Sequence, residues 1–325
     1  MLRCKRVRPA TVRSVAALPD DLAPVIPVPA PPVLGRARST FRSYFLLTKP
    51  RVIELLLVTT VPAMILAEDG LPSVRLVLAV LLGGAMAAGG ANTINCWIER
   101  DRDQMMRRTH GRPLPRGDVS PRAALVFGLA LEALAFAWLW ATVNLLSAGL
   151  AVSAMLFYVF VYTIWLKPRT TQNIVIGGAA GAVPVLVGWV SVTGSLALPA
   201  WMMFAIVFLW TPPHFWALSL RYREDYAAAG IPMLPVVRGT AVAARHILAY
   251  AVILTVVSIA LAAVSSLGWG YVVAASVLGG LFVWQALRLC AEPTPERAIR
   301  LFTFSNTYLA LLFAAIAVDT LLRSA

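Results

Sequence analysis

Three oxygen-bearing side chains, Asn95, Glu99 and Asp103, recur at every fourth position of the sequence. On an α-helix, positions four apart differ by only about 40° around the axis, so the three side chains would form one stripe. Carboxylate and amide oxygens suit Mg²⁺, a hard cation that commonly shares its coordination shell with the phosphate groups of a substrate. The spacing therefore predicts a magnesium site on one face of a helix.

A run of arginines follows this stripe at once: Arg107, Arg108, Arg112 and Arg116. A guanidinium group binds phosphate oxygens in a planar, two-pronged way. Metal ligands followed by arginines predict a diphosphate site. The alternative is an ordinary charged loop whose acids pair with its arginines.

The elements that position these residues are predicted to be transmembrane helices, in an all-α fold. The chain is 59% hydrophobic with a mean hydropathy of +0.77, whereas soluble domains are about 45–50% apolar. A helix of roughly 20 apolar residues crosses the hydrocarbon core, where lipid offers backbone groups no other partner. Nine segments qualify: 52–67, 76–98, 123–142, 147–166, 172–192, 199–220, 246–265, 270–288 and 301–321.

The basic residues are distributed unevenly about these nine segments. With the start of the chain on the cytoplasmic side, 26 of the 28 lysines and arginines fall on that side, and only Arg75 and Arg323 fall on the other. This asymmetry follows the positive-inside rule. It predicts a cytoplasmic N-terminus, chemistry at the cytoplasmic face and no nucleic-acid partner, despite the net charge of +13.

Residues 1–44 differ in composition from the transmembrane domain predicted for 45–325. They are basic and rich in proline, which predicts a disordered tail. Mitochondrial transit peptides are poor in acids, and Asp20 and Asp21 therefore weaken that interpretation of the tail. A bacterial plasma membrane is favoured over the alternative, a mitochondrial inner membrane. Small residues crowd 81–95 and 174–189, either for close helix packing or to leave room for a substrate.

Four segments, in order, resemble the UbiA-type intramembrane prenyltransferases. They are LLTKPRVIELLLVTT (46–60), NCWIERDRDQMMRRTHGRPLPRG (95–117), YTIWLKPRTTQNIVIGGAAGAVPVLVGW (162–189) and TPPHFWALSLRYREDYAAAGIPMLPVV (211–237). The sequence is most similar to the heme-directed branch of that superfamily, the protoheme IX farnesyltransferases. The resemblance implies nine transmembrane helices around a central cavity that opens to the cytoplasmic side.

The resemblance also implies an activity. Members of this branch join farnesyl diphosphate to a vinyl group of protoheme IX (heme B) and add water, giving heme O and diphosphate for terminal oxidases. Heme B is thus a substrate, Mg²⁺ is the expected cofactor, and the protein is expected to lie in the lipid bilayer. A heme A synthase or a terminal oxidase assembly is a further expected partner.

Site residues are carried over on the same resemblance. The catalytic set is Asn95, Glu99, Asp103, Arg108, Arg112 and Lys167. The substrate-binding set is Arg107, His214, Asp225, Tyr162 and Asn173, and the metal ligands are Asn95, Glu99, Asp103 and Asp225. His214 could ligate heme iron, relay a proton or simply hydrogen-bond.

Two positions depart from the superfamily pattern. Glu99 stands where many members have aspartate, and Ala229 stands four residues beyond Asp225, so the second acidic motif is incomplete. The number of metal ions is therefore open. Glu54, Glu132 and Asp319 are acids within apolar segments, where acids commonly mark function, but the sequence assigns them no role.

Three other functions remain open from the residues. One is a prenyltransferase of the same fold that acts on an aromatic acceptor. Another is a secondary transporter, although transporter sites lie near the bilayer midplane whereas the charges here gather at one face. A heme chaperone is the third, and it would not need the stripe of Asn95, Glu99 and Asp103.

Overall fold

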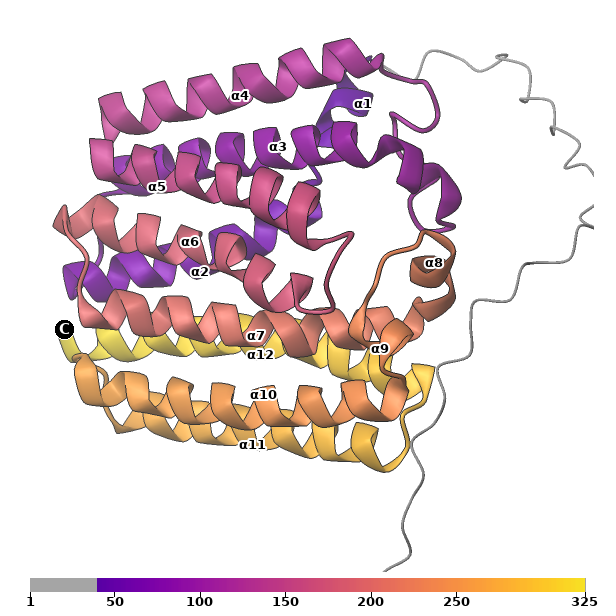
Figure 1. Ribbon diagram of the computed structural model, residues 1–325. Coiled ribbons are helices and arrows are strands. Elements are labelled where there is room, and N and C mark those ends of the chain that lie inside the picture. The colour runs from indigo at the N-terminus through magenta and orange to yellow at the C-terminus, as the bar shows by residue number, and fades with distance from the viewer. Residues whose placement is uncertain (1–39, 325) are drawn as a thin grey trace, which may run out of the picture. The chain divides into compact units, whose positions relative to one another are not determined.

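The computed structural model describes residues 40–324, and its long helices lie side by side (Figure 1). No strand occurs within that range. The elements are α1 (Thr40–Leu47), α2 (Pro50–Glu68), α3 (Val74–Met105), α4 (Pro121–Thr142), α5 (Leu145–Leu156), the π-helix η1 (Phe157–Leu166), α6 (Asn173–Thr193), α7 (Leu198–Arg221), α8 (Arg223–Ala228), α9 (Leu234–Val237), α10 (Thr240–Ala260), the 3₁₀-helix η2 (Leu261–Val264), α11 (Trp269–Ala291) and α12 (Pro295–Ser324).

Eight of the described helical segments are long and apolar enough to cross a membrane, so the chain is a multi-pass membrane protein. They correspond to the second to ninth predicted segments. α2 covers the first, but its qualifying apolar stretch is the shorter Val58–Glu68, so the count of nine stays a prediction. The predicted tail lies mostly outside the described residues, as does the side chain of Glu54. Residues 40–44 begin α1, which packs on α3.

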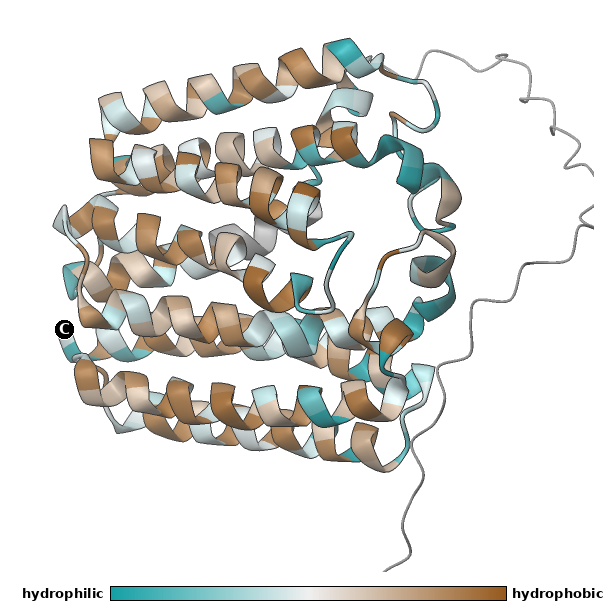
Figure 2. Cartoon of the chain, in the orientation of Figure 1, coloured by the Kyte–Doolittle hydropathy of each residue, from teal (hydrophilic) through white to brown (hydrophobic). Residues whose placement is uncertain are grey.

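The charged residues gather at one end of this helical domain, beside the C-terminal end of α3 and the short helices α8 and α9 (Figure 2). The sides of the long helices are mostly hydrophobic. This distribution places the arginine-rich loop and α8 at the same end of the bundle, although they are far apart in the sequence.

Small residues let neighbouring helices approach closely. A Cβ atom added to Gly90 of α3 would lie 2.9 Å from the carbonyl oxygen of Gly128 in α4, and equally close to the side chain of Glu132. Glu132 is buried in this α3–α4 interface. α2 packs on α6, and α7 contacts α6, α10 and α12.

The half of the domain built from α7, α10, α11 and α12 is filled by a large apolar cluster. The rings of Phe282 and Tyr308 meet at its centre with centroids 5.1 Å apart. Two of its tyrosine hydroxyls are paired: Ser258 Oγ lies 2.8 Å from the Tyr308 hydroxyl, and the Tyr271 hydroxyl donates to the Ser258 carbonyl at 2.6 Å. This half is a packed support, and the open space lies on the side of α3 and α6.

The second half of the segment Leu145–Leu166 is a π-helix rather than an α-helix. Its closing bond runs from Lys167 N to the Tyr162 carbonyl at 2.8 Å, five residues apart. Such wide turns are rare in proteins, and those that occur are often found at functional sites. This turn aims Tyr158 and Tyr162 into the interior and delivers Lys167 to α3.

Asp319 of α12 caps the start of α11. Its carboxylate accepts hydrogen bonds from the backbone N–H groups of Gly268 at 2.6 Å and Tyr271 at 3.0 Å. The first N–H groups of a helix have no partner within the helix, and the helix dipole favours negative charge there. This acid therefore has a structural function at the end of the bundle away from α8 and α9.

We expect Asp319→Ala to lower the free energy of unfolding by about 1–2 kcal/mol, because it removes a charged cap. Asp319→Asn, which keeps an acceptor oxygen, should cost less. Unfolding of the purified protein by titration with SDS measures both, with Asp101→Ala, whose side chain is 79% exposed, as the control. An Asp319→Ala transition that coincides with wild type would contradict the capping role.

Candidate functional site

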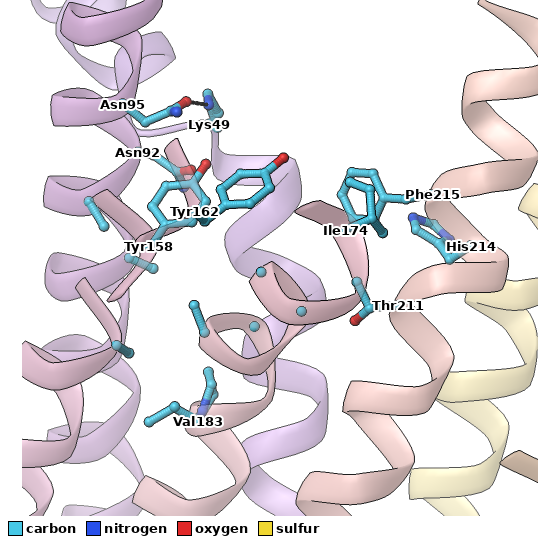
Figure 3. Close-up of a pocket in the computed structure, with 18 of the residues that line it drawn as sticks. Lys49, Asn92, Asn95, Tyr158, Tyr162, Ile174, Val183, Thr211, His214 and Phe215 are labelled. Carbon is cyan, nitrogen blue, oxygen red and sulfur yellow. Dashed lines mark hydrogen bonds between the residues drawn. The ribbon is translucent and has the colours of Figure 1, made fainter. Parts of the chain in front are cut away.

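A cavity of about 690 Å³ lies among α2, α3, α5, η1, α6, α7 and α12 (Figure 3). Its volume is within the range of roughly 300–1,000 Å³ that small-molecule sites occupy. One part of its wall is built from small and apolar residues, including Gly84, Ala87 and Gly181. The other part holds the charged side chains at the end of α3.

Asn95, Glu99 and Asp103 all line this cavity from one face of α3. They are 1%, 5% and 3% exposed. The helix continues without a break from the small-residue segment to Met105, so the four-residue spacing becomes the stripe that the sequence predicts. Two carboxylates and an amide oxygen therefore face a shared space.

Each carboxylate of the stripe is paired with a cation from another segment. Lys167, which follows η1, forms an ion pair with Glu99, and Arg112 Nη1 donates to Asp103 Oδ2 at 2.7 Å. Burial alone would lower the pKa values of Lys167 and Arg112, but attraction to Glu99 and Asp103 outweighs burial and raises both. Both groups remain cations at the cavity wall.

Lys49 completes the arrangement from the connection between α1 and α2. Its Nζ donates to Asn95 Oδ1 at 2.7 Å, while Asn95 Nδ2 donates to Thr163 Oγ1 at 3.1 Å. Lys49 has φ 54° and ψ 62°, the left-handed region that non-glycine residues rarely adopt and that is found at functional sites. Burial lowers the pKa of Lys49, so its charged form would gain from an anion in the cavity.

Positive charge exceeds negative charge in the lining of the cavity. The cations are Lys49, Arg102, Arg108, Arg112 and Lys167, and the anions are Glu99 and Asp103. Five cations against two carboxylates leave an excess of three positive charges. A diphosphate group would complement it, whereas a charged loop that only pairs its own acids would not carry this excess into a cavity.

Several other predicted site residues also reach the cavity. Arg108, Tyr162 and His214 line it. His214 lies on α7, across from Tyr158 and Tyr162 (Figure 3). The interior of the site is thus aromatic on two sides.

Three predicted residues do not belong to the lining. Arg107 is exposed, and Asp225 is half-buried in α8, which contributes Tyr226 to the wall instead. Asn173 is buried at the start of α6, where its amide donates to the Thr170 carbonyl at 2.6 Å. Among the described residues, no three or more His, Cys, Asp or Glu side chains form a metal-binding group.

Sequence reasoning missed residues that reach the site from distant segments. Lys49, Tyr158 and Thr163 have no recognisable spacing to the stripe. Phe302 and Asn306 of α12 line the cavity from a segment more than half the chain away. Lys49 alone had a signal in the sequence, as a basic residue followed by Pro50, just before the first apolar segment.

Comparison with known proteins assigns the chain to a family. The model of the UbiA prenyltransferase family matches residues 56–313, and the chain belongs to that family. A protoheme IX farnesyltransferase of Parafrankia sp. (strain EAN1pec) is 53% identical over 292 residues, which are 89% of this chain and 93% of the relative. The protoheme IX farnesyltransferase of Mycobacterium tuberculosis (strain ATCC 25618 / H37Rv) is 51% identical over 293 residues, covering 89% of this chain and 94% of the relative.

Solved structures share the fold at low sequence identity. A structure of digeranylgeranylglyceryl phosphate synthase has a TM-score of 0.72 at 18% identity, covering 86% of this chain and 98% of that one. A UbiA homologue from Archaeoglobus fulgidus bound to DMAPP and Mg²⁺ has a TM-score of 0.60 at 19% identity, covering 85% and 99%.

Two glycines one turn apart on α6 allow the two explanations for small residues, close helix packing and room for substrate, to be tested separately. A Cβ atom at Gly177 would lie 2.2 Å from Cδ2 of Tyr162, whereas one at Gly181 would meet no atom within 4 Å and would enter the cavity. We expect Gly181→Leu to fold normally but to lower kcat/KM for prenyl transfer roughly tenfold or more, because it displaces substrate.

Gly177→Ala should instead destabilise the protein by about 1–3 kcal/mol through overpacking against Tyr162. Thermal unfolding and product formation, measured for both variants, separate the two effects. Full activity in Gly181→Leu would show that substrate does not occupy this part of the cavity.

Proposed function

We propose that the protein transfers the farnesyl group of farnesyl diphosphate to a vinyl group of protoheme IX (heme B), with addition of water, to give heme O and diphosphate. The observation that carries this proposal is the cavity wall with five cations and two carboxylates beside an apolar hollow. The choice of protoheme as the acceptor is supported by the relatives named protoheme IX farnesyltransferase, which are 51–53% identical over most of the chain.

Asn95, Glu99 and Asp103 fit a divalent cation. Their donor atoms are hard oxygens on one buried face, and too few to form a complete cage, which suits an ion that completes its shell with phosphate oxygens and water. Mg²⁺ is present with prenyl diphosphates in two structures of the Archaeoglobus fulgidus homologue. When bound, it would neutralise charge on the diphosphate. Asp225, which lies off the cavity wall, would support a second ion only if α8 moved inward.

The cations of the wall bind and stabilise the leaving diphosphate. Lys49, Arg112 and Lys167 are held in place by the stripe before substrate arrives, so they need little reorganisation as negative charge develops. Preorganised donors of this kind act strongly in a site that excludes water. Arg108, exposed at the rim, adds a contact from the loop.

The chemistry balances as one substitution and one addition. The C1–O bond of farnesyl diphosphate breaks and its electron pair leaves with diphosphate. The vinyl group forms a C–C bond to C1, water adds to the resulting cation beside the porphyrin ring, and a proton is released. Aromatic faces stabilise cations, and the stacked rings of Tyr158 and Tyr162, with centroids 5.5 Å apart, lie beside Lys167.

The location that we propose is a bacterial plasma membrane, with the N-terminus and the charged end of the protein in the cytoplasm. Support comes from the basic residues, 26 of 28 of which fall on that side of the nine predicted segments. The product supplies terminal oxidases, directly or through a heme A synthase.

We expect Asp103→Asn to lower the rate of heme O formation by about 10²–10³-fold, the loss seen when one preorganised electrostatic group is removed. The variant keeps a partner for Arg112 but removes the carboxylate. Purified protein is incubated with protoheme, farnesyl diphosphate and Mg²⁺, and heme O is detected by mass spectrometry, with and without a chelator. Asp101→Asn, two residues away and exposed, is the matched control.

Loss of product in Asp103→Asn and with chelator, but not in Asp101→Asn, would support the assignment. Prenylation of an aromatic acceptor in place of protoheme would move the protein to another branch of the family. No transfer to any acceptor by folded protein would refute the prenyltransferase function.

Lys49 gives the binding step a pH dependence. Because burial lowers its pKa, Lys49 loses its proton at a lower pH than an exposed lysine does, and binding of a diphosphate by the charged form weakens as pH rises through that value. We expect the dissociation constant of farnesyl thiodiphosphate to increase toward alkaline pH, and Lys49→Arg to remove this increase. An identical pH profile in the two proteins would exclude Lys49 from diphosphate binding.

A further inference from the structure

His214 of α7 is held rigidly at the cavity wall. It is only 7% exposed and lines the cavity. Its ring stacks on Trp210, with centroids 4.2 Å apart and planes at 24°, and lies against Phe302 of α12 at 4.5 Å and 31°. The Trp210 indole N–H donates to the Ser305 carbonyl at 2.7 Å, which ties this turn of α7 to α12. The orientation of the imidazole is therefore fixed before any ligand arrives.

A short hydrogen-bond chain determines which ring nitrogen carries the proton. His214 Nδ1 lies 2.7 Å from Ser305 Oγ, and Ser305 Oγ donates its one proton to the Phe302 carbonyl at 2.6 Å. A hydroxyl that donates elsewhere can only accept from the imidazole. We therefore assign the proton to Nδ1, which leaves the lone pair of Nε2 available. No described residue forms a hydrogen bond with Nε2.

An imidazole with Nδ1–H satisfied by the protein and Nε2 free is the form in which histidine ligates metals. The proposed acceptor substrate brings an iron ion into this cavity. His214 lies on the wall opposite the stripe of α3 and the tyrosines of η1 (Figure 3). An iron atom anchored at α7 leaves the edge of the porphyrin free to extend toward the diphosphate end.

We propose that His214 Nε2 is an axial ligand of the iron of the protoheme substrate, and that Ser305 is a positioning residue that fixes the tautomer. This inference rests on the proposed function, because it needs protoheme as the acceptor. Ligation to the iron would select one face and one tilt of the macrocycle. It thereby explains why the buried ring faces the cavity without a protein partner for Nε2.

The test is the spectrum of ferric and ferrous protoheme bound to the purified full chain. In wild type we expect a nitrogen-ligated spectrum and, in the ferrous state, an iron–histidine stretching band by resonance Raman. His214→Ala should lose both, and added imidazole should restore the nitrogen-ligated spectrum. His214→Leu, which preserves volume better and cannot ligate iron, is the second variant in case the alanine variant does not fold.

Ser305→Ala should retain a histidine ligand but shift the iron–histidine band and weaken protoheme binding by about tenfold, as expected when the partner of a ligating histidine is removed. His246→Ala is the matched control, because His246 is exposed on α10, away from the cavity lining, with a hydrogen bond to the Val242 carbonyl and a ring contact with Trp216. A purely structural function for Ser305 would not move the band.

The outcomes separate this inference from the proposed function. An unchanged spectrum in folded His214→Ala or His214→Leu, while wild type still makes heme O, overturns ligation and leaves farnesyl transfer standing. A loss of heme O formation in these variants without a spectral change also overturns ligation and points to His214 as a proton acceptor. Wild-type protein that neither binds protoheme nor makes heme O overturns both.

Discussion

Two carboxylates buried in the wall of a cavity inside a membrane protein must be compensated, and the geometry of the charged end follows from this requirement. An uncompensated buried charge is strongly destabilising, whereas a paired and hydrogen-bonded one is tolerated. Glu99 and Asp103 therefore draw Lys167 from the end of η1 and Arg112 from the loop after α3 onto one helix face. The ion pair of Glu99 with Lys167 thus fixes η1 against α3, although the two helices are far apart in the sequence.

In the proposed function, the same pairing prepares the site for an anion. Cations that are already desolvated and oriented by carboxylates would contact phosphate oxygens if a divalent ion took their place at Glu99 and Asp103. The packed half of α7, α10, α11 and α12 supports this end, while small residues on α3 and α6 keep the interior open. The packed half and the open cavity thus lie on opposite sides of one bundle. α7 belongs to the packed half and contributes His214 to the cavity wall.

The sequence predicts the features that depend on local periodicity. The stripe of α3, the apolar segments and the arginines near the stripe can all be found in neighbouring residues. It does not predict the left-handed backbone of Lys49, the π-helical turn that delivers Lys167, or the bond between His214 and Ser305. These depend on contacts between distant segments or on a backbone state that tertiary packing imposes. Asp225 illustrates the converse, because a family motif placed it at the site and its helix holds it away from the wall.

The most direct test of the account is a structure with farnesyl thiodiphosphate and Mn²⁺ in place of Mg²⁺, in which anomalous scattering locates the metal. The account predicts a peak at about 2.0–2.3 Å from oxygens of Glu99 and Asp103, with the thiodiphosphate between it and Lys49, Arg112 and Lys167. A metal bound only to Asp225 of α8, with the stripe still paired to its cations, would contradict it.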